Sequence, residues 1–220
     1  AAKSKHDVIM TPTDYAYLDY AQGDPAGEPI NIGGYVTLEK VYSFEPVPKE
    51  LTAEEGKYVI GGQGNIWTEY MKTPEKVEYM AFPRMLAMAE SVWSRAEDKN
   101  FADFTRRLNA HFARLDKQNV SYRIPEPAGL VNRVLAPGEK ATLDLTPIPG
   151  ARVFYTIDGS APDEKSTPYT KPLQIDVPEK GCVDVKAVVV LGSGRKSSVY
   201  SATLLCRDWL MSVEQEGKTA

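Results

Sequence analysis

The stretch GGQGNIWTEY, residues 61–70, follows an apolar run and precedes a helix signal. The apolar run is typical of a buried strand. Thr73 and Pro74 suit the N-cap and the first position of a helix. A strand that leads into a helix is the repeating unit of α/β proteins. Trp67 and Glu69 stand two residues apart at the end of this strand. Because alternate residues of a strand share a face, we expect the indole and the carboxylate side by side.

A second pair of the same kind occurs earlier in the chain. Tyr17 and Asp19 are two residues apart in YAYLDYAQGD (15–24), just after an expected strand that Pro12 ends. In α/β barrels, the loops after the strands build the active site. A sugar ring offers an apolar face for an aromatic side chain and hydroxyls for a carboxylate. The two pairs therefore predict a sugar site.

A structural reading of the same residues stays open. Trp67 could be a core residue, since a large aromatic ring contributes much buried area. Glu69 could be a carboxylate that the dipole of the following helix favours. The spacing alone does not separate this reading from the binding site.

The rest of the first part supports an α/β protein. The pattern predicts a helix from Thr73 to Arg95 with a kink at Pro83, and a second helix capped by Asn100. Asp103 stands where a capping carboxylate could reach back. The apolar face of the second helix consists of Phe101, Phe104, Leu108, Phe112 and Leu115. The long connection over residues 14–52 is expected to carry small elements of its own.

Only two strands of this type are expected before residue 127. A complete eight-stranded (β/α)8 barrel takes roughly 250 residues. If the fold is a barrel, this chain holds its C-terminal portion, and about half or more of the barrel lies elsewhere.

The composition changes near residue 127. Pro125 and Pro127 in RIPEPAGL suit a domain boundary. Short alternating runs follow, separated by Gly, Pro, Asp and Ser, and they predict an immunoglobulin-like β-sandwich. The expected strands are 140–146, 151–160, 172–177, 183–190 and 198–205. We therefore divide the chain into an α/β part over 1–127, an all-β part over 128–207 and a tail over 208–220.

The composition excludes several classes of protein. The net charge of −4 offers no basic surface for nucleic acid. The sequence contains no apolar run near the roughly 20 residues of a membrane helix. The two cysteines and the two histidines lack metal-ligand spacing, so we expect no metal and no cofactor. The chain starts at Ala1 without a methionine or a signal peptide, so we expect a piece of a longer protein whose targeting information is not in view. The sequence does not indicate an oligomeric state.

The two cysteines flank a predicted hairpin whose turn is LGSGRKS. If Val190 faces Ser198, then Cys182 faces Cys206. Facing residues have Cα atoms roughly 4.5–5.5 Å apart, within reach of a disulfide. A one-residue bulge in the turn would separate the pair and leave two buried free thiols. We predict adjacent strands for the two cysteines, and the disulfide stays open.

Several long motifs together resemble the catalytic domain of glycoside hydrolase family 20, the β-N-acetylhexosaminidases. The motifs occur in family order over residues 5–127, and they are HDVIMTP, YLDYAQGD, GGYVTLEKVYSFEPVP, GGQGNIWTEY, VEYMAFPRMLAMAESVW and DFTRRLNAHFARLDKQNVSYRIPEP. Residues 128–205, with VFYTIDGSAP, resemble the small β-sandwich that follows the barrel in many bacterial members.

The resemblance implies a role for each paired residue. The residue matching Tyr17 bonds the acetamido oxygen of the sugar, and the residue matching Asp19 binds a hydroxyl at its far edge. The tryptophan matching Trp67 lines the pocket, and the glutamate matching Glu69 binds the hydroxyls at positions 4 and 6. The implied substrates are glycans that end in β-linked N-acetylglucosamine or N-acetylgalactosamine. Export to the bacterial periplasm or cell surface is implied as well.

The resemblance also shows what this chain lacks. The family's catalytic carboxylates form an adjacent Asp-Glu pair, and no Asp-Glu occurs in residues 1–127. The pair Asp163-Glu164 lies in the all-β part, and we assign it no catalytic role. We therefore expect the isolated chain to be inactive.

Two alternative functions remain from the sequence. One is a non-catalytic truncated chain or a carbohydrate-associated binding module. The other is a different barrel glycosidase that uses Asp19 and Glu69 as its carboxylates, which requires about 5–9.5 Å between them across a cleft.

Overall fold

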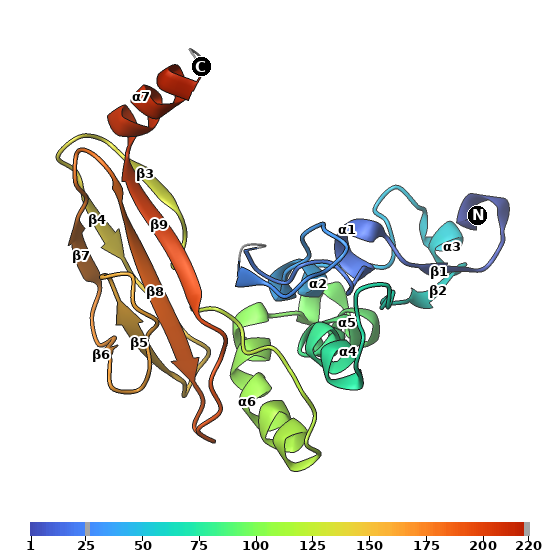
Figure 1. Ribbon diagram of the computed structural model, residues 1–220. Helices are drawn as coiled ribbons and strands as arrows, with labels where there is room; N and C mark the ends of the chain where they lie inside the picture. The colour runs from blue at the N-terminus through green and yellow to red at the C-terminus, as the bar shows by residue number, and fades with distance from the viewer. Residues whose placement is uncertain (25–26, 218–220) are drawn as a thin grey trace. The chain divides into compact units, whose positions relative to one another are not determined.

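A computed structural model of the protein describes residues 1–24 and 27–217 (Figure 1). The chain forms two compact units, Ala1–Arg123 and Ile124–Ala220, and each is described by itself.

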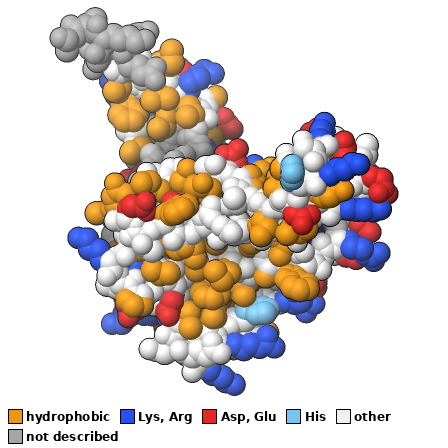
Figure 2. Space-filling view, turned by 90° about the vertical axis from the view of Figure 1, so that its right-hand side faces the viewer, with side chains coloured by type: hydrophobic (Ala, Val, Ile, Leu, Met, Phe, Trp, Pro, Cys, Tyr) orange, Lys and Arg blue, Asp and Glu red, His pale blue; other side chains and the backbone are white. Residues whose placement is uncertain are grey.

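The first unit contains two parallel strands. Strand β1 (Val8–Met10) pairs with β2 (Val59–Gly62), with Val8 opposite Val59 and Met10 opposite Gly62. The side chains of Ile9 and Ile60 are 51% and 60% exposed. Parallel sheets normally have both faces covered. Within the described residues, this pair therefore lacks the full cover that a parallel sheet normally has. Figure 2 shows a face of the molecule on which hydrophobic side chains gather between charged ones.

The first unit also contains helices and loops. They are η1 (Ala2–Ser4), α1 (Thr13–Ala16), α2 (Leu38–Tyr42), α3 (Ala53–Gly56), α4 (Pro74–Ala81), α5 (Arg84–Trp93), η3 (Ala96–Asp98) and α6 (Phe101–Lys117). The single kinked helix expected over 73–95 is in fact two helices, because Pro83 interrupts the backbone pattern between α4 and α5. As expected, the long connection over 14–52 carries small helices.

Helix α6 is amphipathic, as the sequence predicts. Its buried side chains are Phe104, Leu108, Phe112 and Leu115. Asn100 caps it by accepting a hydrogen bond from the Asp103 backbone N–H at 3.0 Å. The prediction that the Asp103 carboxylate reaches back toward the cap is wrong. That carboxylate instead pairs with Arg106 at 2.6 Å and with Arg107 at 2.8 Å, one turn further along the same helix.

The second unit is built of strands. They are β3 (Arg133–Leu135), β4 (Lys140–Leu143), β5 (Arg152–Thr156), β6 (Thr167–Pro168), β7 (Leu173–Asp176), β8 (Cys182–Val190) and β9 (Tyr200–Cys206). Among the described residues they form a five-stranded sheet in the order β3-β9-β8-β5-β6 and a two-stranded sheet β4-β7. The strands β3 and β6 are too short for the sequence pattern to reveal.

A helix, α7 (Arg207–Gly217), occupies most of the stretch that the sequence left as a tail, while residues 218–220 of that tail lie outside the described residues. No helix in the described part of the chain is long and apolar enough to cross a membrane.

The cysteines lie on adjacent antiparallel strands, β8 and β9, as predicted. Cys182 faces Leu205 rather than Cys206, so the register is shifted by one residue. Nearer the turn, Val190 pairs with Lys196 instead of Ser198, which locates the shift in the turn region. Because a one-residue shift turns a side chain to the other face, Cys182 is exposed and Cys206 is buried, and both are free thiols.

Candidate functional site

The parallel arrangement of β1 and β2 continues beyond the strands. Leu18 donates its backbone N–H to the Asn65 carbonyl at 2.7 Å, and Asn65 donates to the Ala16 carbonyl at 2.7 Å. These bonds form a parallel bridge between Tyr17 and Asn65. The segments that carry the two aromatic-x-acid pairs are therefore joined side by side, past the C-terminal ends of both strands.

Side-chain hydrogen bonds lock the same junction. Asn65 is buried, and its amide donates to the Thr11 hydroxyl at 2.7 Å, while its oxygen accepts from the Gln63 amide at 2.7 Å. This network joins the residues that follow β1 to those that follow β2. Asn65 was not among the predicted residues, although an amide side chain directly after a buried strand is a signal that marks such a position.

The four predicted side chains lie in one region. The rings of Tyr17 and Trp67 have centroids 6.5 Å apart and are tilted by 49°. Trp67 is 52% exposed, Glu69 is exposed, and Asp19 is buried. Glu69 is near enough that its charge acts on Asp19. The reading of Trp67 as a core residue is therefore wrong, because half of its surface is free.

The expectation that strand alternation places each pair on one face is wrong. Trp67 and Glu69 lie beyond the end of β2, and Tyr17 and Asp19 follow the short helix α1, so neither pair is on a strand. Strand alternation does not set their direction. The backbone bridge between Tyr17 and Asn65 brings the pairs together instead.

The surroundings of Asp19 shift the pKa of its carboxyl and leave one of its oxygens without a partner in the part of the chain that the structure describes. Burial raises the pKa of its carboxyl, and the nearby Glu69 charge raises it further. A hydrogen bond to its own backbone and the Arg84 guanidinium act in the opposite direction, but the pKa remains above the ordinary value. Its Oδ1 atom is buried without a hydrogen-bond partner among the described residues. This oxygen is therefore available to accept a hydrogen bond from a ligand.

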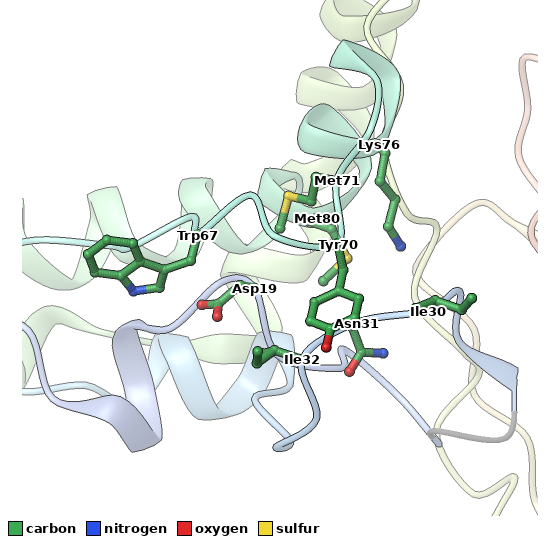
Figure 3. A pocket seen from close by; sticks show the side chains of 9 residues that line it. All are labelled: Asp19, Ile30, Asn31, Ile32, Trp67, Tyr70, Met71, Lys76 and Met80. Atoms are coloured by element: carbon green, nitrogen blue, oxygen red, sulfur yellow. The ribbon is translucent and has the colours of Figure 1, made fainter.

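A shallow pocket starts at Asp19 and Trp67 (Figure 3). Its lining residues are Asp19, Ile30, Asn31, Ile32, Trp67, Tyr70, Met71, Lys76 and Met80. In Figure 3 the Asp19 carboxylate lies on the Trp67 side, and Lys76 and Ile30 lie at the opposite end. The pocket itself encloses almost no free space. We call the surface formed by Tyr17, Asp19, Trp67 and Glu69 the wall.

Neither the histidines nor the single Asp-Glu pair adds chemistry to this site. Within the described ranges, no group of three or more His, Cys, Asp or Glu side chains is placed to hold a metal ion. Asp163 and Glu164 belong to the second unit. Asp163 accepts the Lys165 backbone N–H at 2.8 Å and shapes a turn, and Glu164 pairs with Lys196 at 3.2 Å.

Family models match both parts of the chain. Residues 1–96 match the catalytic domain of glycosyl hydrolase family 20, and residues 142–204 match the Fn3 associated family.

Curated relatives point the same way. A beta-hexosaminidase of Porphyromonas gingivalis is 42% identical over 217 residues, which are 97% of this chain and 27% of that protein. An N,N'-diacetylchitobiase of Vibrio harveyi is 28% identical over 200 residues, covering 72% of this chain and 22% of that protein. The chain thus spans about a quarter of the length of the relatives it matches.

Solved structures share the fold of part of the chain. The GH20 beta-N-acetylhexosaminidase of Streptomyces coelicolor A3(2) superposes with a TM-score of 0.50 at 26% identity, over 56% of this chain and 25% of that one. A mutant Streptomyces plicatus beta-hexosaminidase in complex with its product GlcNAc superposes with the same TM-score at 27% identity, with the same coverage. These structures agree with a portion of a barrel.

Proposed function

We propose that this chain, which belongs to glycosyl hydrolase family 20, forms part of an exo-acting β-N-acetylhexosaminidase. The complete protein would remove terminal β-linked N-acetylglucosamine or N-acetylgalactosamine from glycans. The observation that carries this proposal is the junction of the two aromatic-x-acid pairs, with the Tyr17 and Trp67 rings 6.5 Å apart beside a buried carboxylate that has an unpartnered oxygen.

Each residue of this wall suits one part of the sugar. The exposed indole of Trp67 offers a flat surface to the apolar face of the ring and to the acetamido group. The carboxylates of Asp19 and Glu69 accept hydrogen bonds from ring hydroxyls, and charged acceptors make these bonds stronger than neutral ones. The Tyr17 hydroxyl donates to the acetamido oxygen.

The proposed reaction is substrate-assisted, an exception to the scheme with two enzyme carboxylates. The acetamido oxygen attacks the anomeric carbon while the bond from that carbon to the leaving oxygen breaks. A carboxylic acid from another part of the protein protonates the leaving oxygen. Within this chain, Tyr17 holds the attacking oxygen in line, and the other three side chains fix the ring. Such alignment lowers the barrier because it removes the entropy cost of orienting the reacting atoms.

Hydrolysis of an aryl N-acetyl-β-glucosaminide by the complete protein tests the proposal. Glu69→Gln should lower kcat/KM by roughly 10- to 100-fold, since a hydrogen bond to a charged group contributes about 1.5–3 kcal/mol. Glu54→Gln is the matched control, because Glu54 is exposed on α3 and pairs only weakly with Lys57 at the surface. The proposal fails if the complete protein does not release the aryl group, or if both variants behave alike.

For the second unit we propose a β-sandwich in which the sheet β4-β7 packs on the five-stranded sheet. The alternating burial of β4 and β7 supports this arrangement. On each of these strands every second residue is buried, and these residues are Ala141, Leu143, Leu173 and Ile175. One face of the two-stranded sheet is thus apolar and covered, which is typical of paired sheets.

A further inference from the structure

Arg84 is a fully buried cation beneath the sugar-binding wall. It opens helix α5, and its relative exposure is 0%. Its hydrogen bonds within the described residues all go to backbone carbonyl oxygens. Nη1 donates to Tyr20 at 3.0 Å and to Val36 at 2.7 Å, and Nη2 donates to Leu18 at 2.5 Å and to Met80 at 2.8 Å.

Two of these acceptors flank Asp19 in the chain. The carbonyls of Leu18 and Tyr20 belong to the residues on either side of it, so one planar guanidinium fixes the backbone before and after the carboxylate. The third acceptor, Val36, belongs to the neighbouring segment, which is itself tied to this loop by the bond from the Val36 N–H to the Ala21 carbonyl at 2.9 Å. The fourth acceptor, Met80, anchors the group to the end of α4.

The charge of Arg84 is costly for a purely structural role. Burial and the neighbouring Arg123 lower the pKa of Arg84 to about 9, although it stays protonated at neutral pH. Apolar residues of similar volume often replace buried charged groups without loss of stability. An apolar residue could not supply the planar fork of hydrogen-bond donors that the guanidinium provides.

We propose that Arg84 is a positioning residue of the sugar site. By hydrogen bonding the carbonyls of Leu18 and Tyr20, which we call the clamp, it holds the Asp19 carboxylate beside Trp67. The inference rests on the proposed function, because it assigns the clamp to the same site. Arg84 does not itself touch the sugar. Its effect on the reaction passes through Asp19.

A double-mutant cycle in the complete protein tests the clamp. Arg84→Lys keeps the charge but loses the fork, so it should lower kcat/KM for an aryl N-acetyl-β-glucosaminide by about tenfold. In an Asp19→Asn background the same change should cost less than about threefold, because residues that act through one another are not additive. Arg107→Lys is the matched control. The Arg107 guanidinium also uses its fork, to Glu90 at 2.7 Å and to Asp103 at 2.8 Å, but these bonds do not reach the loop that carries Asp19. Its effect should be small and equal in both backgrounds.

A second pair of variants tests the clamp without altering Arg84. A Cβ on Gly34 would lie 2.2 Å from the Tyr20 ring, whereas a Cβ on Gly33 would meet nothing within 4 Å. Both glycines have positive φ, +72° and +102°, so Ala strains the backbone at either position. Gly34→Ala should displace Tyr20 and reduce kcat/KM several-fold more than Gly33→Ala, and most of this difference should vanish in the Asp19→Asn background.

The outcomes separate the two proposals. If the wild-type protein has no turnover, the proposed function fails and the inference fails with it. If the wild type is active but Arg84→Lys costs the same with and without Asp19, the clamp is refuted alone. Should Arg84→Lys unfold, as circular dichroism would show, the glycine pair decides. Equal activity of Gly34→Ala and Gly33→Ala would then overturn the inference.

Discussion

The binding role proposed for Asp19 works against the stability of the folded protein. Its carboxylate is buried beside Glu69, and one of its oxygens lacks a partner in the described part of the chain. A buried polar atom without a hydrogen bond destabilises the folded protein by about 1–3 kcal/mol. An unpartnered carboxylate oxygen at a pocket wall is stabilised only when a bound ligand donates a hydrogen bond to it.

Asp19→Asn should therefore stabilise the complete protein at pH 7, by roughly 1 kcal/mol. The folded-state pKa of Asp19 lies above its ordinary value of 3.8. Above the folded pKa the carboxylate is charged in both states, and its burial is unfavourable, so the gain is fully present. The gain should shrink as the pH falls through the folded pKa and vanish below 3.8, where Asp19 is protonated in both states. Thermal unfolding of both proteins from pH 3 to pH 8 measures this, and a gain that grows toward low pH would contradict it.

Tyr17→Phe should mainly affect the chemical step in the complete protein. The hydroxyl holds the attacking acetamido oxygen in line, so we expect kcat to fall on the order of 10²-fold, the loss expected when a reacting atom is misplaced. KM should change far less, since the ground state is held by the other side chains. Steady-state kinetics separate the two constants. A raised KM with unchanged kcat would show that Tyr17 only binds.

At the scale of elements, the turn between β8 and β9 determines the chemistry of both cysteines. We expect a membrane-permeant thiol reagent to modify Cys182 in the folded protein and Cys206 only after unfolding, because Cys182 is exposed and Cys206 is buried. Mass spectrometry of native and denatured samples counts the modified thiols. An intramolecular Cys182–Cys206 disulfide in the native protein would contradict the observed register.

The elements also show what the sequence could predict. The periodicity of α6 identified its buried face, because a 3.6-residue pattern depends only on local spacing. The split between α4 and α5 needed the geometry at Pro83, where a kink and a break give the same pattern. The junction of Tyr17 with Trp67 was predicted from spacing, yet a bridge through Asn65 produces it. Such a contact joins residues far apart in sequence, so no local pattern encodes it.

Buried positions without apolar character were the hardest to predict. Arg84 lies in the apolar pattern of α5 and would be read as a surface charge, although it is completely buried. Its role depends on four carbonyls from separate segments. Lys76, whose ammonium is buried at the far end of the pocket, was missed for the same reason.

At the scale of the whole molecule, the first unit has two of the strands that a barrel needs, and their side chains Ile9 and Ile60 remain half exposed or more. The chain spans 27% of the Porphyromonas relative. We therefore expect the isolated chain to have no hexosaminidase activity, since the Asp-Glu pair is not among residues 1–127. Loss of a general acid alone typically reduces the rate by about 10²–10⁴-fold. Turnover of an aryl N-acetyl-β-glucosaminide by purified chain, abolished by Glu69→Ala, would contradict this expectation.

The position of β9 bears on the order in which the second unit is made. This strand is the last of the unit, yet it lies inside the larger sheet, between β3 and β8. A ribosome adds about 5–20 residues per second and releases the N-terminal side first. During synthesis, the edges of β3 and β8 that pair with β9 therefore stay unpaired until residues 200–206 emerge. A nascent chain stalled before this strand would expose two unpaired edges, the kind of surface that chaperones cover and that aggregates recruit.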